Sequence, residues 1–320
     1  MRAAAQAQPN IALIKYWGKK DLQTNLPAVG SLSITLDSLW TRVTVDFPDD
    51  GQPDRLQVNG EFSPGMLSRV SRCLDQVAGN DRLPALVQSE SNFPIAAGLA
   101  SSASVFAALV LAADRAAGRA RDVLPLARLA GRSSGSAARS LYGGFTELRL
   151  AGETIETEQL LRPSDWPLQV VVAVTEEGAK PLGSGDAMIR SAKSSPFYAS
   201  WVERQDDDLH AARSAVMARD FAKLAAVSEH NCLKMHSVMW TSRPPIVYWN
   251  RATLSCMQVV RQLQQDGLAV FFTIDAGPQL KAVCLPAAAA AVATALAETP
   301  GVIRIMQSAL GAGARLLEPQ

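Results

Sequence analysis

Apolar and polar positions alternate with two different periods along this chain. A continuous apolar run covers 11–14, and every second residue is apolar in 31–36, 43–47 and 56–58. A period of two is typical of strands whose alternate side chains face a core. The Asn-Gly pair that follows the last of these segments favours a tight turn.

A period near 3.6 predicts helices between and after these strands. In 67–77, apolar residues recur every three or four positions, which places them on one helical face. The first half of the chain therefore predicts helices over 64–78, 105–113 and 123–129 (ending at Gly131), with strands over 86–90 and 145–150.

The second half begins with a junction. Residues 164–167 (SDWP) predict a boundary, so we expect one domain over 1–165 and a second over 166–320. Residues 180–196 are rich in Gly, Ser and Lys, which predicts a loop. The elements expected here are strands over 169–174, 270–274 and 281–285 and after 311–313, with helices from 206 toward His236 and over 251–265 and 287–298.

Composition excludes several classes of function. The 320 residues are 48% hydrophobic, which suits one large or two medium domains. The net charge of +1 provides no global field for nucleic acid or a membrane, so anion binding must be local. The apolar stretches 96–113 and 287–297 are too rich in small residues or too short to span a bilayer, and the N-terminus has no secretory signal. Four scattered cysteines favour the cytoplasm, and the three histidines form no metal pattern.

The stretch 93–104 (FPIAAGLASSAS) is a candidate phosphate-binding segment. Its small residues allow a close backbone approach, and its serines stand where a helix begins. A helix N-terminus has unpaired N–H groups and a positive dipole, and it binds anions. A buried Ala/Ser helix packed closely on a neighbour would have the same composition, so the residues alone leave both interpretations open.

Two charged residues interrupt apolar segments. Lys15 follows the run 11–14, and Asp275 follows the strand 270–274 just before a Gly-Pro turn. A carboxylate beside a lysine and phosphates can orient or accept a hydroxyl proton. The alternatives are a lysine that snorkels from a strand end and an aspartate that caps a turn. The G-x-S-x-G match at 131–135 follows a helix rather than a strand, which argues against a serine hydrolase.

Five blocks occur together in a fixed order. They are 10–19 (NIALIKYWGK), 31–36 (SLSITL), 98–104 (GLASSAS), 134–145 (SGSAARSLYGGF) and 272–278 (FTIDAGP). With these blocks the sequence resembles the mevalonate diphosphate decarboxylases of the GHMP kinase superfamily. The resemblance implies an α+β fold with a ribosomal-protein-S5-like N-terminal lobe. It also implies a C-terminal lobe of helices on an antiparallel sheet, and one deep cleft between the lobes.

The resemblance also implies an activity. Members phosphorylate the 3-hydroxyl of mevalonate 5-diphosphate from ATP with Mg²⁺, then lose phosphate and CO2 to give isopentenyl diphosphate. A cytoplasmic homodimer is expected from it. Three catalytic residues are implied: Asp275 to orient or deprotonate the hydroxyl, Lys15 to hold Asp275 and the phosphoryl group, and Arg139 to grip the substrate carboxylate.

Binding residues follow from the same blocks. The implied substrate contacts are Tyr16, Lys19, Ser134, Gly135, Ser136 and Ser184. The implied ATP contacts are Asn92, Gly98, Leu99, Ala100, Ser101, Ser102 and Ser104, with Ser102 also assigned to the metal ion.

Two departures from the family pattern concern the substrate's phosphate side. Residues 27–31 read PAVGS where the family has Pro-x-Asn-x-Ser, and Gly185 stands where some bacterial members carry an arginine that contacts the diphosphate. A 5-monophosphate substrate is therefore an alternative. A kinase that does not decarboxylate is a second, although such kinases tend to lack the aspartate. A non-catalytic metabolite binder is a third.

Overall fold

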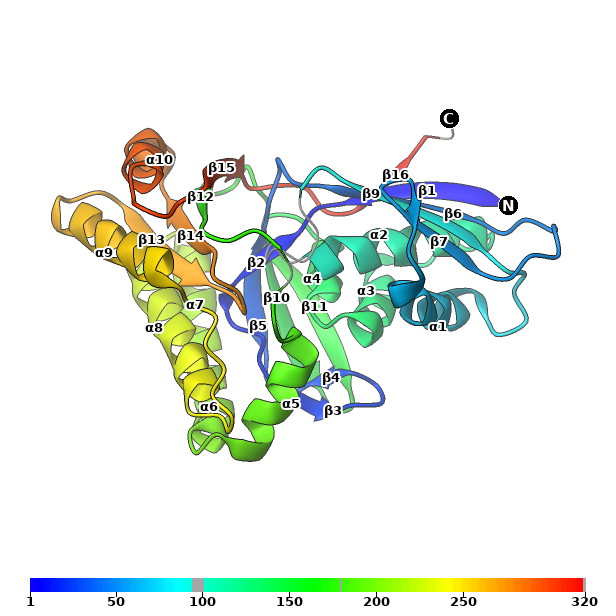
Figure 1. Ribbon diagram of the computed structural model, residues 1–320, viewed down its shortest axis with the longest axis horizontal. Coiled ribbons are helices and arrows are strands. Elements are labelled where there is room, and N and C mark those ends of the chain that lie inside the picture. The colour runs from blue at the N-terminus through cyan, green and yellow to red at the C-terminus, as the bar shows by residue number, and fades with distance from the viewer. Residues whose placement is uncertain (94–100, 179, 319–320) are drawn as a thin grey trace.

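Two lobes flank a central sheet (Figure 1). The computed structural model describes residues 1–93, 101–178 and 180–318. Helices and strands are mixed throughout these residues, as expected for the α+β class. None of the helices in the described ranges is long and apolar enough to cross a membrane.

The N-terminal lobe is a six-stranded sheet with helices on it. In β6 the residues at 41, 43 and 45 are buried, as the alternation in the sequence predicts. These side chains pack on three helices: α1 (Leu67–Ala78, after the 3-10 turn η1 at Pro64–Met66), α2 (Ser101–Ala116) and α3 (Val123–Ser133). The strand order is β16 (Arg315–Leu317), β1 (Arg2–Ala7), β6 (Thr41–Asp46), β9 (Leu86–Ser91), β7 (Arg55–Val58) and β8 (Glu61–Phe62).

The central sheet is antiparallel and stands between the two wings of Figure 1. All five residues of β2 and of β5 are buried, because this sheet is covered on both faces. Its order is β11 (Thr154–Leu161), β10 (Phe145–Ala151), β5 (Ser31–Thr35) and β2 (Asn10–Ile14). The short α4 (Ala137–Ser140) precedes β10, and the hairpin β3 (Lys19–Asp21) and β4 (Leu26–Pro27) follows β2.

The C-terminal lobe holds a second antiparallel sheet and most of the helices. Its strands are β13 (Val270–Ile274), β14 (Leu280–Cys284), β12 (Gln169–Val174) and β15 (Arg304–Ala309), in that order. Its helices are α5 (Ser184–Ser194), α6 (Tyr198–Glu203), α7 (Gln205–Ala218), α8 (Phe221–Trp240), α9 (Arg251–Gln265) and α10 (Ala289–Ala297), the last preceded by the 3-10 turn η2 (Pro286–Ala288).

The central sheet and the C-terminal lobe share one hydrophobic core, and the N-terminal lobe has a core of its own. Apolar side chains of the central sheet, of α7 and of one face of the C-terminal sheet form a single cluster. Phe145 and Trp166 stack inside it with ring centroids 5.2 Å apart. The chain also returns to its start, since β16 pairs with β1 and Leu36 bridges Leu310.

Most predicted elements are confirmed, but three predictions need correction and three longer strands were missed. The segment 180–196 contains the helix α5, although its Gly and Ser content predicted a loop. The helix that begins near 206 ends at Ala218 and a new one starts at Phe221, because Arg219 takes a left-handed conformation (φ 54°). α3 continues past Gly131 to Ser133. Strands β1, β11 and β15 were not predicted, since their apolar alternation is weak.

Candidate functional site

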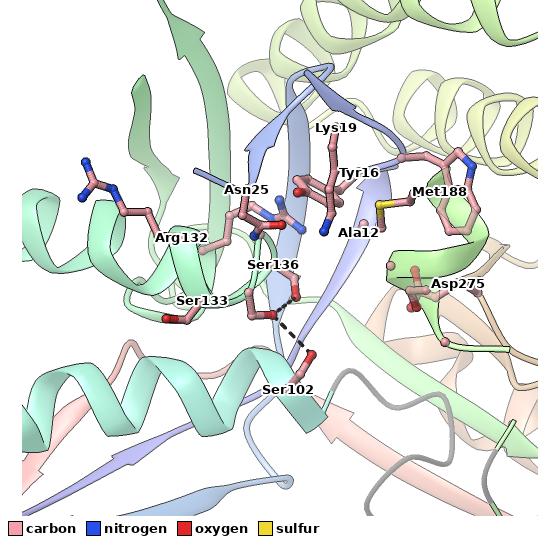
Figure 2. Close-up of a pocket in the computed structure, with 18 of the residues that line it drawn as sticks. Ala12, Tyr16, Lys19, Asn25, Ser102, Arg132, Ser133, Ser136, Met188 and Asp275 are labelled. Carbon is pink, nitrogen blue, oxygen red and sulfur yellow. Dashed lines mark hydrogen bonds between the residues drawn. The ribbon is translucent and has the colours of Figure 1, made fainter. Parts of the chain in front are cut away.

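A cavity of about 620 Å³ opens between the lobes. Its walls come from the end of β2, from α1, from the start of α2, from the segment 132–139 and from the segment 180–188, with Asp275 on the C-terminal side. Figure 2 shows these side chains converging from both halves of the chain. The expected cleft between the lobes is therefore present.

The cavity has a strong excess of positive charge. Among its described lining residues one carboxylate, Asp275, faces seven cationic side chains: Lys15, Lys19, Arg69, Arg72, Arg132, Arg139 and Lys180. The chain as a whole carries a net charge of only +1. Positive charge is thus concentrated at one place, which favours ligands that carry several negative charges.

Lys15 and Asp275 meet at the wall of this cavity. The Lys15 ammonium lies 2.7 Å from Asp275 Oδ1 and also donates to the Ala12 carbonyl at 2.9 Å. The Lys15 side chain is 1% exposed and that of Asp275 is 24% exposed. Burial alone would raise the pKa of Asp275, but two lysines outweigh it, and the pKa lies well below its ordinary value. Asp275 is therefore an ionised acceptor that is still open to the cavity.

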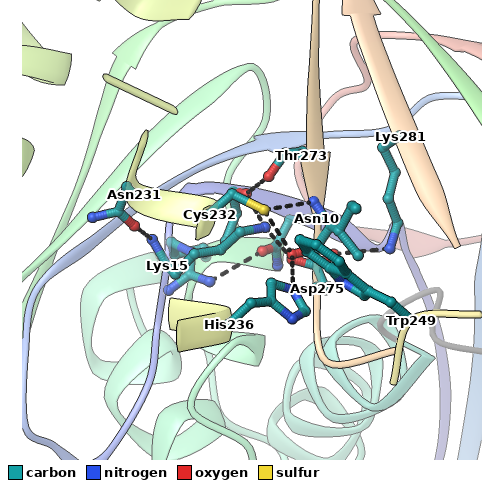
Figure 3. Close-up of polar contacts among 12 residues, drawn as sticks. Asn10, Lys15, Asn231, Cys232, His236, Trp249, Thr273, Asp275 and Lys281 are labelled. Atoms are coloured by element: carbon teal, nitrogen blue, oxygen red, sulfur yellow. Dashed lines mark hydrogen bonds and ion pairs between the residues drawn. The ribbon is translucent and has the colours of Figure 1, made fainter. Parts of the chain in front are cut away.

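The second lysine on Asp275 is Lys281. Its ammonium lies 3.2 Å from Oδ2 (Figure 3). Sequence reasoning treated Lys281 only as the start of a strand. The signal that singled out Lys15, a lysine inside an apolar strand, applied equally to this residue.

Arg139 is a buried guanidinium surrounded by neutral partners. It donates to Ser33 Oγ (2.9 Å), Ser31 Oγ (2.5 Å) and Asn10 Oδ1 (3.3 Å). Within the described part of the chain it forms no ion pair. Burial lowers its pKa to about 10. A charge that is desolvated without a counter-ion is costly, so this group is suited to an incoming anion.

Hydroxyl groups line the wall next to Arg139. Ser134 Oγ lies 3.3 Å from Ser102 Oγ and 3.5 Å from Ser136 Oγ, as Figure 2 shows. The buried Tyr16 hydroxyl has no hydrogen-bond partner among the described residues. Burial raises the pKa of Tyr16 to about 12, so it remains a donor at neutral pH.

Gly135 is required by its contact with Tyr16. A Cβ atom at this position would lie 2.2 Å from the Tyr16 hydroxyl oxygen. No larger residue fits there unless the Tyr16 ring moves. The glycine therefore sets the position of a cavity-lining hydroxyl.

The start of α5 approaches Asp275 from the other side. The Lys180 ammonium donates to Ser184 Oγ (2.6 Å) and to the Ala276 carbonyl (2.7 Å). Burial lowers the pKa of Lys180 to about 8. Desolvation also lowers the pKa of Lys19, and a Cβ at Gly185 would lie 4.0 Å from the Lys19 ammonium.

The predicted ATP contacts differ in what the structure says of them. Gly98, Leu99 and Ala100 lie outside the described residues. The Ser104 hydroxyl is buried against Thr41 Oγ1 at 2.8 Å. The Asn92 side chain bonds to the Trp40 amide and the Ser38 carbonyl instead, each at 2.8 Å. Ser101 and Ser102, by contrast, line the cavity.

The residues at the 27–31 departure are packed away from the cavity. A Cβ at Gly30 would lie 2.6 Å from Leu209 and 3.0 Å from the Leu148 carbonyl. Val29 is buried in an apolar cluster. Neither residue lines the cavity.

The G-x-S-x-G match at 131–135 lacks the required structural context. Its serine, Ser133, ends the helix α3 rather than following a strand, so a serine hydrolase finds no support.

Sequence reasoning missed several cationic and polar wall residues. Lys180, Arg69, Arg72 and Arg132 line the cavity together with Asn10. The arginines on α1 and α3 have the pattern of ordinary solvated helix faces. Only the fold shows that they line the same cavity.

Comparison with known proteins identifies two family models that together span most of the chain. Residues 7–158 match the diphosphomevalonate decarboxylase-like N-terminal domain, and residues 170–309 match the mevalonate 5-diphosphate decarboxylase C-terminal domain. The diphosphomevalonate decarboxylase of Candida albicans is 32% identical over 349 residues, which covers 97% of this chain and 96% of the relative.

Solved structures agree over the whole length. Mevalonate diphosphate decarboxylase from Staphylococcus aureus superimposes with a TM-score of 0.92 at 34% identity, over 99% of this chain and 98% of that one. A structure described as "MDDEF in complex with MVAPP, AMPPCP and Magnesium" gives a TM-score of 0.91 at 35% identity, over 100% and 99%. These matches confirm the α+β fold that the resemblance implied.

Proposed function

Because the chain belongs to the diphosphomevalonate decarboxylase family, we propose that it converts mevalonate 5-diphosphate to isopentenyl diphosphate with ATP. The observation that carries this proposal is the Lys15–Asp275 ion pair, 2.7 Å long, at the wall of a cationic cavity. The buried Arg139 on the same wall provides a place for a carboxylate. The substrate and ATP together bring the many negative charges that this cavity favours.

In the first step, the 3-hydroxyl oxygen of the substrate attacks the γ-phosphorus of ATP, ADP leaves with the electron pair of the broken P–O bond, and the hydroxyl proton passes to Asp275. Asp275 accepts a hydrogen bond from that hydroxyl and orients its oxygen toward phosphorus. Lys15 and Lys180 lie next to Asp275 and neutralise charge on the transferred group. The triphosphate lies at the N-terminus of α2, near Ser101 and Ser102.

In the second step, phosphate and CO2 leave together. The C–O bond to the new phosphate breaks, and the phosphate departs with that electron pair. The electron pair of the C–CO2 bond becomes the new C=C bond, so the reaction needs no cofactor as an electron sink. Arg139 holds the carboxylate through its planar guanidinium, which Ser31 and Ser33 keep in one orientation.

Magnesium would be held mainly by phosphate oxygens. The described residues contain no group of three or more His, Cys, Asp or Glu that could form a metal site. Mg²⁺ prefers hard oxygen ligands and usually keeps several waters beside substrate phosphates, so the Ser102 hydroxyl suits it. When bound, the ion would supply neutralisation of phosphate charge.

The diphosphate is proposed as the preferred substrate. Lys19, Tyr16, Ser134 and Ser136 line the cavity and provide its contacts. Ser184 bonds to Lys180 and acts through it. Gly185 stands where some family members carry an arginine that contacts the diphosphate, so the monophosphate is the second candidate substrate.

A domain boundary near residue 165 is likewise proposed, supported by the family matches to 7–158 and 170–309. The homodimer and the cytoplasmic location stay predictions.

The test is to incubate the purified protein with ATP, Mg²⁺ and either mevalonate 5-diphosphate or the 5-phosphate. We expect ADP and CO2 in equal amounts, with a higher kcat/KM for the diphosphate. ADP without CO2 would indicate a kinase. No turnover of either compound would indicate a metabolite binder.

A further inference from the structure

Lys281 lies in the middle of the C-terminal sheet, an unusual place for a lysine. It pairs with Thr273 of β13 on one side and with Val172 of β12 on the other. Every residue of β14 is buried, and the Lys281 side chain is 1% exposed. Burying an ammonium group costs several kcal/mol unless an anion compensates it. The desolvation of the Lys281 ammonium group therefore requires a nearby anion.

The compensating anion is Asp275. Lys281 lies directly opposite Thr273, so its side chain is on the same face as residue 275, two positions further along. From there its ammonium reaches Asp275 Oδ2 at 3.2 Å, while Lys15 approaches Oδ1 at 2.7 Å. Figure 3 shows the two lysines on opposite sides of the carboxylate. Lys281 does not line the cavity, so it contacts Asp275 from the protein interior rather than from the cavity.

We propose that Lys281 is a positioning residue of the proposed reaction, which fixes the plane of the Asp275 carboxylate so that its open edge faces the substrate hydroxyl. The inference rests on the proposed function. A single contact at Oδ1 would leave the carboxylate free to rotate, because the terminal torsion of aspartate is broad. Two cations, one on each oxygen, restrict that rotation.

The surroundings of Asp275 strengthen this role. Charged or titratable groups approach it from several elements: Lys15 after β2, Lys281 on β14, Arg139 on α4, Lys180 before α5, and Cys232 and His236 on α8. Burial lowers the pKa of His236 to about 3 and raises that of Cys232, so both are neutral at pH 7. Lys15 and Lys281 are the two that form ion pairs with Asp275.

The test is Lys281→Met, which keeps an unbranched side chain one atom shorter than that of lysine and removes its charge. We expect kcat to fall by about 10- to 100-fold while KM for both substrates changes by less than about threefold, because the loss is in orientation. Removing one cation also raises the pKa of Asp275. The acidic limb of the kcat/KM profile should therefore move to higher pH, since activity is lost as pH falls through that pKa.

Arg261→Met is the matched control. Arg261 pairs with Glu229 and packs over Phe272 of β13, the strand that precedes Asp275, but it has no contact with Asp275. We expect it to reduce stability and leave kcat and the pH profile unchanged. The proposal is overturned if Lys281→Met keeps the wild-type kcat and pH profile, or if Arg261→Met shifts the pH profile equally.

If Lys281→Met does not fold, Lys281→Gln is used for the same comparison. Its amide carries no charge and ends one atom short of the lysine ammonium, so we expect both the shift of the acidic limb and the loss of kcat. An unshifted limb would contradict the proposal. Failure of the proposed function is distinguishable, because the wild-type protein itself would then release no CO2.

Discussion

Arg139 carries a buried charge that a bound anion would neutralise. It is buried, and its hydrogen-bond partners Ser31, Ser33 and Asn10 are all neutral. We expect Arg139→Met to lower kcat/KM for mevalonate 5-diphosphate by at least about 100-fold, because a buried charge pair with the substrate carboxylate is lost. Steady-state kinetics of CO2 release measures this effect.

The same variant should change the ligand-free protein very little. The hydrogen bonds that it removes are offset by relief from burying an uncompensated charge, so we expect the free energy of unfolding to change by less than about 1 kcal/mol. Arg162→Met, at a side chain that is 73% exposed, is the control for activity. A variant at 139 that kept full kcat/KM would exclude the carboxylate-binding role.

At the scale of elements, α8 aligns the two halves of the Lys15–Asp275 pair. Asn231 Oδ1 accepts from the Lys15 amide at 2.8 Å. Its neighbour Cys232 contacts both the amide and the carbonyl of Ile274, at 3.2 and 3.4 Å. One turn of helix therefore holds the backbone on both sides of the ion pair.

Removing the Asn231 amide should disturb this alignment. Asn231→Ala leaves the buried Lys15 N–H without its partner, so we expect a loss of about 1–3 kcal/mol of stability. We also expect a fall in kcat of about 10-fold or more with little change in KM. Urea unfolding and steady-state kinetics measure the two effects.

Ser228→Ala is the control on the same helix. The Ser228 hydroxyl is buried and has no hydrogen-bond partner among the described residues. Its removal should leave stability and kcat nearly unchanged. If both variants lower kcat equally, the effect belongs to the helix as a whole rather than to the Asn231 contact.

The elements and the reacting ion pair differ in how far the sequence predicts them. The helix over 251–265 and the strand over 270–274 are confirmed at their predicted bounds, because the helix has a clear period, the strand is an unbroken apolar or β-branched run, and both have strong end signals. α5 was missed, because local Gly and Ser content outweighed its weaker apolar pattern. The contact of Lys281 with Asp275 depends on strand register, which single-sequence patterns do not determine.

At the scale of the whole molecule, the shared core couples the central sheet to the C-terminal lobe. Phe145 on β10 stacks on Trp166 within a cluster that includes the central sheet and the C-terminal sheet. We expect a single unfolding transition, with tryptophan fluorescence and circular dichroism coinciding. Phe145→Ala should lower the free energy of unfolding by about 3–5 kcal/mol and keep one transition. Phe62→Ala, at a residue 67% exposed, should have little effect. Two separate transitions would contradict the shared core.

The most direct test of the central claim compares the wild-type protein with Asp275→Asn. ADP and CO2 released from ATP and mevalonate 5-diphosphate are measured in parallel for both proteins. The account predicts equal amounts of both products from the wild type. For Asp275→Asn it predicts a loss of at least about 100-fold in both rates, because the oriented acceptor is gone. An Asp275→Asn protein that released CO2 at the wild-type rate would contradict it.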